Sequence, residues 1–182
     1  MLLTSLMLAA DKVDSTTGVQ MAYLKKWAPR SFNNLNMQLP KLLPGAGKTL
    51  RGDATTLVDE LPPVDVVYLD PPYNQHRYFT NYHVWETLVR WDRPPSYGVA
   101  MKREDSRAAE HRSPFNYRRE MAPAFFGVLS RLKAAVVLVS YNNEAWISEE
   151  EMRNAISDSG FEAVEVLGFD HKRYVGAQIG IY

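Results

Sequence analysis

The residues with the clearest chemistry are the four from Asp70 to Tyr73, which read Asp-Pro-Pro-Tyr directly after an apolar run. The Asp70 carboxylate and the Pro71 backbone carbonyl can each accept one hydrogen of a planar amino group. Two such bonds turn the nitrogen lone pair, otherwise delocalised into a ring, toward an incoming electrophile. Pro71 and Pro72 stiffen the loop and bring no N–H groups that would compete for these acceptors. The pattern predicts a loop that activates a planar amino group, such as that of a nucleobase, toward an electrophile.

Tyr73 completes this loop with an aromatic ring. A base in a duplex must leave the stack before its amino group can react, which costs a few kcal/mol. Stacking on an aromatic side chain returns about 1 to 3 kcal/mol per base. We therefore expect Tyr73 to stack on a flipped base. The alternative interpretation is that the four residues form only a tight turn after a strand.

Polar and basic residues follow this loop. Asn74, His76 and Arg77 come next, and the segment 102–119 carries six Lys or Arg residues against three Asp or Glu. A local basic face of this kind can track phosphates. We expect DNA contacts from Tyr73, Asn74, His76, Arg77, Lys102 and Arg103. The alternative is a solvated surface, because most charged runs are ordinary loops.

Other site chemistries are excluded or disfavoured by the composition. The chain has no cysteine and four scattered histidines, so disulfides and thiolate metal sites are absent and no metal ligand set is expected. The segment Gly45 to Thr49 resembles part of a phosphate-binding loop. It has Leu42 where that motif needs glycine and no apolar strand before it, so a surface turn is predicted.

The elements that must position the loop follow from hydrophobic patterning. The apolar runs Val64–Leu69 and Ala134–Val139 predict buried strands, the first covered on both faces. Weaker patterns predict strands at 49–51, 161–167 and 174–181. Helices are predicted from the amino terminus to about Trp27, over 54–60, from an Asn81 cap to about Trp91, after Pro114 through Leu132, and from a Ser148 cap to Gly160. The segments 29–44 and 92–113 are predicted loops.

Alternating strands and helices indicate an α/β fold with an open, mostly parallel sheet, helices on both faces and an antiparallel pair at one edge. Such sheets bind ligands at the carboxyl ends of their strands. Asp53, Asp70 and the run Ser140 to Asn142 each follow a predicted strand, so we expect them at that edge.

The length and net charge of the chain limit the number of domains and the kind of DNA site that can be expected. The 182 residues suit one domain, with a helical or irregular leading segment (1–46) and an α/β core (47–182). The formal net charge is zero, so a DNA site must be a local basic face. The apolar start, Met1 to Ala10, has helical spacing and lacks the basic start of a secretory signal. We expect a soluble, cytoplasmic protein without a membrane span.

The segments VVYLDPPYNQHRYFTNYHVWETLVRWD, VSYNNEAWIS and HKRYVGAQIGIY resemble the Dam-like family of adenine-specific DNA methyltransferases. The resemblance covers most of the chain. It implies a Rossmann-like methyltransferase fold, DNA as substrate, S-adenosylmethionine as cofactor and no metal. It also implies that Asp70, Pro71, Pro72 and Tyr73 grip the flipped adenine, and that Asp70 and Asp53 contact the cofactor. For Asp53 the alternative is a helix cap.

One feature of that family is missing. Its members begin with a strand and a Phe-x-Gly-x-Gly loop that holds the amino-acid end of the cofactor, and no such sequence occurs in the 182 residues. We therefore expect the amino-terminal cofactor segment to be lacking. The alternatives are a non-catalytic fragment, a DNA-binding subunit that needs a second polypeptide, and a methyltransferase acting on RNA or a protein amide.

Overall fold

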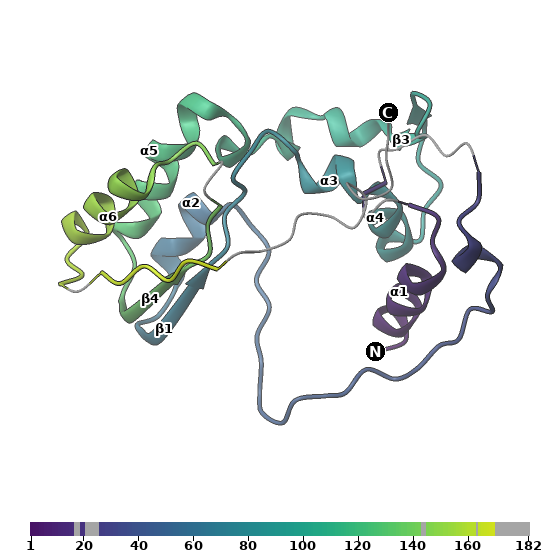
Figure 1. Ribbon diagram of the computed structural model, residues 1–182, viewed down its shortest axis with the longest axis horizontal. Coiled ribbons are helices and arrows are strands. Elements are labelled where there is room, and N and C mark those ends of the chain that lie inside the picture. Colours follow the sequence, from purple (N-terminus) through teal and green to yellow (C-terminus); the bar gives the residue numbers. More distant parts are fainter. Residues whose placement is uncertain (17–18, 21–25, 143–144, 163, 170–182) are drawn as a thin grey trace. The chain divides into compact units, whose positions relative to one another are not determined.

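The computed structural model describes residues 1–16, 19–20, 26–142, 145–162 and 164–169. By its internal contacts the chain divides into two compact units (Figure 1). Unit 1 comprises Met1–Lys48 and Arg77–Arg112, and unit 2 comprises Thr49–His76 and Ser113–Tyr182. The first boundary is close to the predicted division at residue 46. The return of 77–112 to unit 1 was not predicted, because no composition change marks it.

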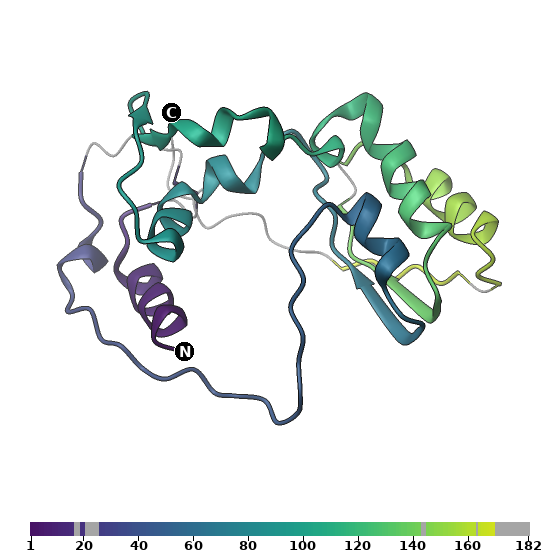
Figure 2. The same ribbon diagram turned by 180° about the vertical axis from the view of Figure 1, so that it is seen from behind.

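Unit 2 is built on two parallel strands. β1 (Val64–Leu69) pairs with β4 (Ala134–Val139), with Val66 opposite Val136 and Leu69 opposite Val139. Both strands have the predicted bounds, and the predicted parallel pairing is confirmed. Figure 2 shows the blue β1 beside the green β4 from behind.

The helices of unit 2 begin at recognisable signals. They are α2 (Ala54–Leu57) with the 3-10 turn η2 (Val58–Glu60), η5 (Pro114–Asn116), α5 (Arg118–Leu129) and α6 (Glu149–Asp158). At α6 the Ser148 hydroxyl accepts from the Glu151 backbone N–H and the Glu151 carboxylate accepts from the Ser148 N–H, a capping box. Gly160 ends this helix with φ 92°, a left-handed conformation that favours glycine.

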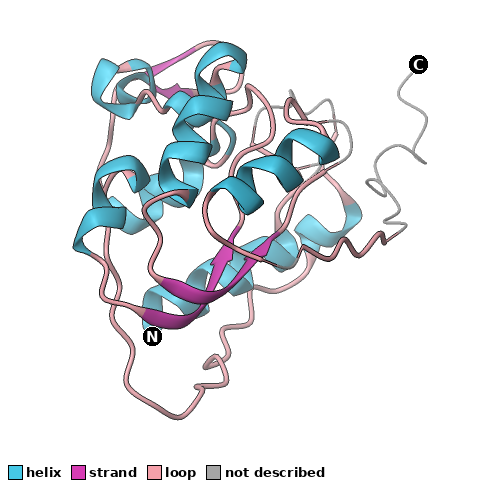
Figure 3. Cartoon of the chain, turned by 90° about the vertical axis from the view of Figure 1, so that its left-hand side faces the viewer, coloured by secondary structure: helices cyan, strands magenta, loops and turns pink. Residues whose placement is uncertain are grey.

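The core of unit 2 lies on one face of these strands. Met121, Phe125 and Leu129 of α5 are almost fully buried, and Leu69 and Val139 pack against the same cluster. The prediction that 64–69 is covered on both faces is wrong for the described residues. Val66, Tyr68 and Leu138 alternate with the core residues and are 54%, 63% and 52% exposed, because the buried side chains of α5 and α6 pack with Leu69 and Val139 on the core face. Figure 3 draws the strands in magenta and the helices in cyan.

Unit 1 is mainly helical. Its elements are α1 (Leu2–Val13), η1 (Pro29–Phe32), α3 (Tyr78–Asn81), α4 (His83–Arg90), β2 (Ser96–Tyr97), β3 (Lys102–Arg103), η3 (Glu104–Arg107) and η4 (Ala109–His111). β2 and β3 form a short antiparallel hairpin inside the predicted loop 92–113.

The first helix ends well before Trp27, since Asp14 is already extended, with ψ 160°. The part of that prediction at 17–18 and 21–25 lies outside the described residues. Asn81 is the last residue of α3 and does not cap α4.

Gln20 joins two parts of unit 1 that are distant in sequence. Its side-chain carbonyl accepts from the Val84 N–H at 2.8 Å, and its backbone carbonyl lies 2.9 Å from Nε2 of His83. Because a carbonyl only accepts, His83 must donate from Nε2. Burial lowers the pKa of His83, and the nearby cations Lys102 and Arg103 lower it further, against the opposing bond to Gln20.

The weaker strand predictions are wrong where the described residues test them. Residues 49–51 form no strand, and the described residues of 161–167 form none either. The predicted strand 174–181 lies outside the described residues. Among the helices of the described residues, none is long and apolar enough to cross a membrane. The same residues contain no group of three potential metal ligands among their His, Asp and Glu side chains.

Candidate active site

The Asp70 loop begins at the carboxyl end of β1, beside the corresponding end of β4. The Ser140 backbone N–H donates to the Leu69 carbonyl at 2.9 Å, which extends the pairing of the two strands to their last residues. Asp70 and Ser140 therefore lie at one edge, as the sequence predicts, whereas Asp53, which was expected at the same edge, does not follow a strand. Pro71 is buried, whereas the Asp70 side chain is exposed and takes part in no hydrogen bond or ion pair with the described residues. The loop therefore combines a buried proline with an exposed carboxylate that is available to a ligand.

Asn116 holds the chain just after this loop. Its side-chain amide donates to the Asn74 carbonyl at 3.1 Å and to the His76 carbonyl at 3.3 Å. Asn74 also accepts a hydrogen bond from the His76 N–H through its side-chain oxygen, at 2.9 Å. Asn116 is only 8% exposed, so its amide is committed to these carbonyls. Sequence reasoning missed it, because nothing in the local pattern links a residue after Pro114 to a loop 40 residues earlier.

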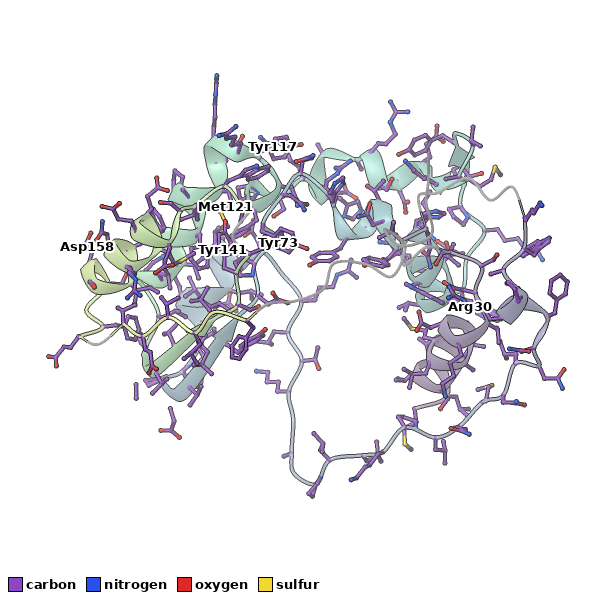
Figure 4. The ribbon with its side chains drawn as sticks, in the orientation of Figure 1. Arg30, Tyr73, Tyr117, Met121, Tyr141 and Asp158 are labelled. Carbon is purple, nitrogen blue, oxygen red and sulfur yellow. The ribbon has the colours of Figure 1, made fainter. Side chains whose placement is uncertain are left out.

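Aromatic side chains gather where the two strands end. Tyr73 follows β1 and Tyr141 follows β4 (Figure 4). The Tyr141 hydroxyl donates to the Met121 sulfur at 3.6 Å, and burial raises the pKa of Tyr141. Tyr73 is half-buried. Tyr73 belongs to the same loop as Asp70, and its role as a stacking surface stays a prediction.

Asp53 caps a helix. One of its carboxylate oxygens accepts from the Thr55 backbone N–H at 2.8 Å and from the Thr55 hydroxyl at 2.7 Å, at the start of α2. A Cβ at Gly52 before it would lie 2.9 Å from the Leu57 side chain, so a larger residue there would require that side chain to shift. The cap interpretation of Asp53 is confirmed. Its contact with a cofactor stays a prediction.

The predicted DNA-contacting residues fall into both units. Asn74 and His76 belong to unit 2, next to the Asp70 loop, and His76 is exposed. Arg77 and Lys102 belong to unit 1, where both are half-buried.

Arg103 is different, because its guanidinium is fully engaged within unit 1. Its five N–H groups donate to Asp92, Asp105 and Thr87 at 2.5 to 3.2 Å. The side chain is 2% exposed. Hydrogen bonds from Arg103 lower the pKa of Asp92 and of Asp105. No donor remains for a phosphate, so we leave Arg103 out of the DNA-contacting set and assign it to the stability of unit 1.

The formal net charge of the whole chain is zero, but the two units carry opposite charges. Unit 1 contains 13 Lys or Arg and seven Asp or Glu, a formal charge of +6, and unit 2 contains eight and 14, a charge of −6. Unit 1 therefore carries the excess of positive charge that the expected local basic face requires. A clustered positive charge is typical of proteins that bind nucleic acid.

In comparison with known proteins, the chain matches one family model and relatives that are named as methyltransferases or methylases. The family described as D12 class N6 adenine-specific DNA methyltransferase matches residues 1–155. Type II methyltransferase M.FokI of Planomicrobium okeanokoites is 30% identical over 95% of this chain and 27% of its own length. Modification methylase StsI of Streptococcus sanguinis is 30% identical over 95% of the chain and 26% of its own length.

A shorter relative matches at the same level. Type II methyltransferase M.CviAII of Paramecium bursaria Chlorella virus 1 is 30% identical over 95% of this chain and 50% of its own length. The chain thus spans about a quarter to a half of the length of these curated relatives. No solved structure matches it.

Proposed function

The chain belongs to the D12 class N6 adenine-specific DNA methyltransferases, and we propose that it takes part in the transfer of a methyl group to the 6-amino nitrogen of an adenine flipped out of DNA. The single observation that carries the proposal is the Asp70 loop at the carboxyl edge of β1 and β4, with its carboxylate exposed and its following residues held by Asn116. The relatives' names, type II methyltransferase and modification methylase, favour a role in restriction and modification.

Asp70 and Pro71 activate the amine in this proposal. Each of the two amino hydrogens is donated to one acceptor, the Asp70 carboxylate or the Pro71 carbonyl. The nitrogen lone pair then points out of the ring plane and can attack. Pro71 is buried, and the restricted φ of a proline limits how far this part of the loop must reorganise when the base arrives. After transfer the amine carries an extra proton, and Asp70 is the nearest group of this loop that can accept it.

Tyr73 and Pro72 keep the flipped base in place. Stacking on Tyr73 offsets part of the cost of leaving the duplex. Pro72 has no backbone N–H and a restricted φ, so it limits the motion of the loop between the acceptors and the stacking ring.

S-adenosylmethionine is the cofactor that we propose, and when bound it would supply the methyl group. The exposed Asp70 carboxylate fits its positive sulfonium by charge. For its amino-acid end the 182 residues offer no Phe-x-Gly-x-Gly loop. The residues of this chain therefore fit the sulfonium group of the cofactor, and they include no such loop for its amino-acid end. We propose Asp70 as the main contact and keep Asp53, which already caps α2, as a second.

We propose that DNA is bound through the basic unit 1 together with residues beside the Asp70 loop. The +6 charge of unit 1 supports this assignment. Lys102 and Arg77 of unit 1 are the candidate phosphate contacts, and Asn74 and His76 are the candidate contacts to the flipped nucleotide. A single catalytic domain over 1–182 with a Rossmann-like sheet is part of the same proposal.

A second polypeptide that completes the sheet is the alternative that one observation favours. In the described residues, the face of β1 and β4 that carries Val66, Tyr68 and Leu138 is about half exposed, although parallel strands are normally covered on both faces. A chain in this state would bind DNA but would methylate it only with that partner present.

The test is calorimetric titration with S-adenosylmethionine, followed by transfer of labelled methyl groups to unmethylated DNA. Asp70→Ala should weaken cofactor binding and reduce transfer about 100-fold or more, by analogy with the loss of one preorganised polar group. Asp65→Ala is the matched control, because Asp65 is an exposed carboxylate within β1.

The possible outcomes separate the two candidates. Cofactor binding and transfer that depend on Asp70 support the enzyme. DNA binding without cofactor binding supports the subunit that needs a second polypeptide. Transfer that Asp70→Ala leaves unchanged contradicts the role of the loop.

A further inference from the structure

Unit 1 contains a hollow of about 470 Å³ that the proposed activity does not use. One wall is α1, with Ala9, Lys12 and Val13, and the other is the segment after η1. That segment contributes four carboxamides, those of Asn33, Asn34, Asn36 and Gln38. No residue of the Asp70 loop lines it, so the hollow belongs to unit 1 alone.

Three of the four carboxamides come from alternate positions of the chain, and Asn33 directly precedes the first of them. Asn34, Asn36 and Gln38 line the hollow, whereas Leu35 and Met37 between them do not. Alternate residues of an extended segment project to the same side, so three carboxamides share one space. Their side chains make no hydrogen bond with the described part of the chain. A ligand therefore meets groups whose hydrogen-bonding capacity is unused.

The chemistry of these groups indicates the ligand. A carboxamide has a donor and an acceptor side by side, which matches the edge of a nucleobase and that of adenine best. Lys12 at the same hollow places an ammonium group where a phosphate can be bound. The volume lies in the range of sites that hold one small ligand, so the hollow has room for one nucleotide.

The charge of the unit points to DNA as the source of that nucleotide. Unit 1 carries +6, which favours a polyanion over an isolated small molecule. We propose that the hollow receives one nucleotide of the DNA target, with its base edge on Asn34, Asn36 and Gln38 and its phosphate at Lys12. It thereby contributes to sequence preference outside the methylated base. This inference rests on the proposed function in taking DNA as the ligand.

The test is selection of bound sequences from a random duplex pool by the full chain, which needs no methyl transfer. The variant carries Asn34→Ala, Asn36→Ala and Gln38→Ala. The matched control carries Leu35→Ala, Met37→Ala and Leu39→Ala, which change the intervening positions of the same segment. Thermal melting confirms that both fold. We expect the wild type to prefer one base about tenfold at one or more positions, and the carboxamide variant to lose that preference while the control keeps it.

Lys12→Ala provides a second measurement. It should weaken binding to all sequences equally and reduce the salt dependence of log K by about one unit. A wild type without sequence preference, or a carboxamide variant that retains it, overturns the inference. Binding of adenosine monophosphate that needs the carboxamides, without any DNA preference, overturns it in favour of a free nucleotide. Sequence preference without methyl transfer counts against the proposed activity and leaves this inference standing.

Discussion

The side-chain amide of Asn116 donates to the backbone carbonyl of Asn74 at 3.1 Å, across 42 positions of sequence. Its second bond, to His76, is 3.3 Å long. These bonds connect η5, the 3-10 turn before α5, to the residues that follow Tyr73. The Asp70 loop is thus bounded by the sheet on one side and by a buried amide on the other.

Asn116→Asp should reduce methyl transfer about 10- to 100-fold. The replacement has nearly the same shape but puts acceptor oxygens against the Asn74 and His76 carbonyls, and a misplacement of about 1 Å can cost a hundredfold in rate. The loss should be mainly in kcat, because Asn116 itself touches no substrate. The measurement is steady-state methyl transfer for Asn116→Asp against Asn154→Asp, an exposed residue of α6. Equal kcat in the two variants would contradict a positioning role.

Arg103→Ala should destabilise unit 1 by about 2 kcal/mol. Removing the buried Arg103 guanidinium leaves the Asp92 and Asp105 carboxylates without a compensating charge. The loss of folding free energy is reduced because these two side chains are 39% and 33% exposed and so remain partly solvated. The measurement is urea unfolding compared with Arg93→Ala, an exposed arginine of the same unit. DNA binding that falls at unchanged stability would restore Arg103 to the DNA-contacting set.

The His83 site should make the stability of unit 1 depend on pH. Burial lowers the pKa of His83, so the unfolded chain binds a proton that the folded chain does not. The stabilisation is therefore present above pH 6.5 and is lost as the pH falls from there toward the folded-state pKa. We expect the melting temperature to fall by a few degrees between pH 7.5 and pH 5.5. His83→Gln should remove this part of the pH dependence; an identical slope in the variant would refute the assignment.

Asp53→Ala should cost about 1 kcal/mol through loss of the α2 cap. Asp53→Asn retains a side-chain oxygen that can accept from the Thr55 N–H, so it should recover most of that stability. The two variants also test the cofactor contact, because Asn keeps the cap but removes the charge. Wild-type affinity for S-adenosylmethionine in Asp53→Asn would show that the residue is structural only.

The sequence predicted the elements whose signals are local. Strands 64–69 and 134–139 have the bounds expected from uninterrupted β-branched and apolar runs, and the first is delimited by Pro63 and Asp70. The Ser148 cap and the Gly160 stop were also correct. In each case the signal and the structure it specifies are only a few residues apart.

The failures have a common cause in contacts that are distant in sequence or specific in geometry. The strand at 49–51 was predicted from a pattern too short to specify a partner, and Leu50 there is 46% exposed. Charge counting placed Arg103 on a DNA-binding face because it cannot show that Asp92 and Asp105 enclose the guanidinium. Asn116 gave no signal at all, since its partners are 40 and 42 positions away.

The opposite charges of the two units should lower the solubility of the protein at low ionic strength. Its isoelectric point is about 6.9, so near neutral pH no net repulsion keeps molecules apart. Unit 1 of one molecule, at +6, is then attracted to unit 2 of another, at −6. At low ionic strength the purified protein should cloud reversibly, and about 0.15 M salt, where screening acts within about 8 Å, should clear it. DNA competes for the same positive charge and should act as a solubilising agent in its own right.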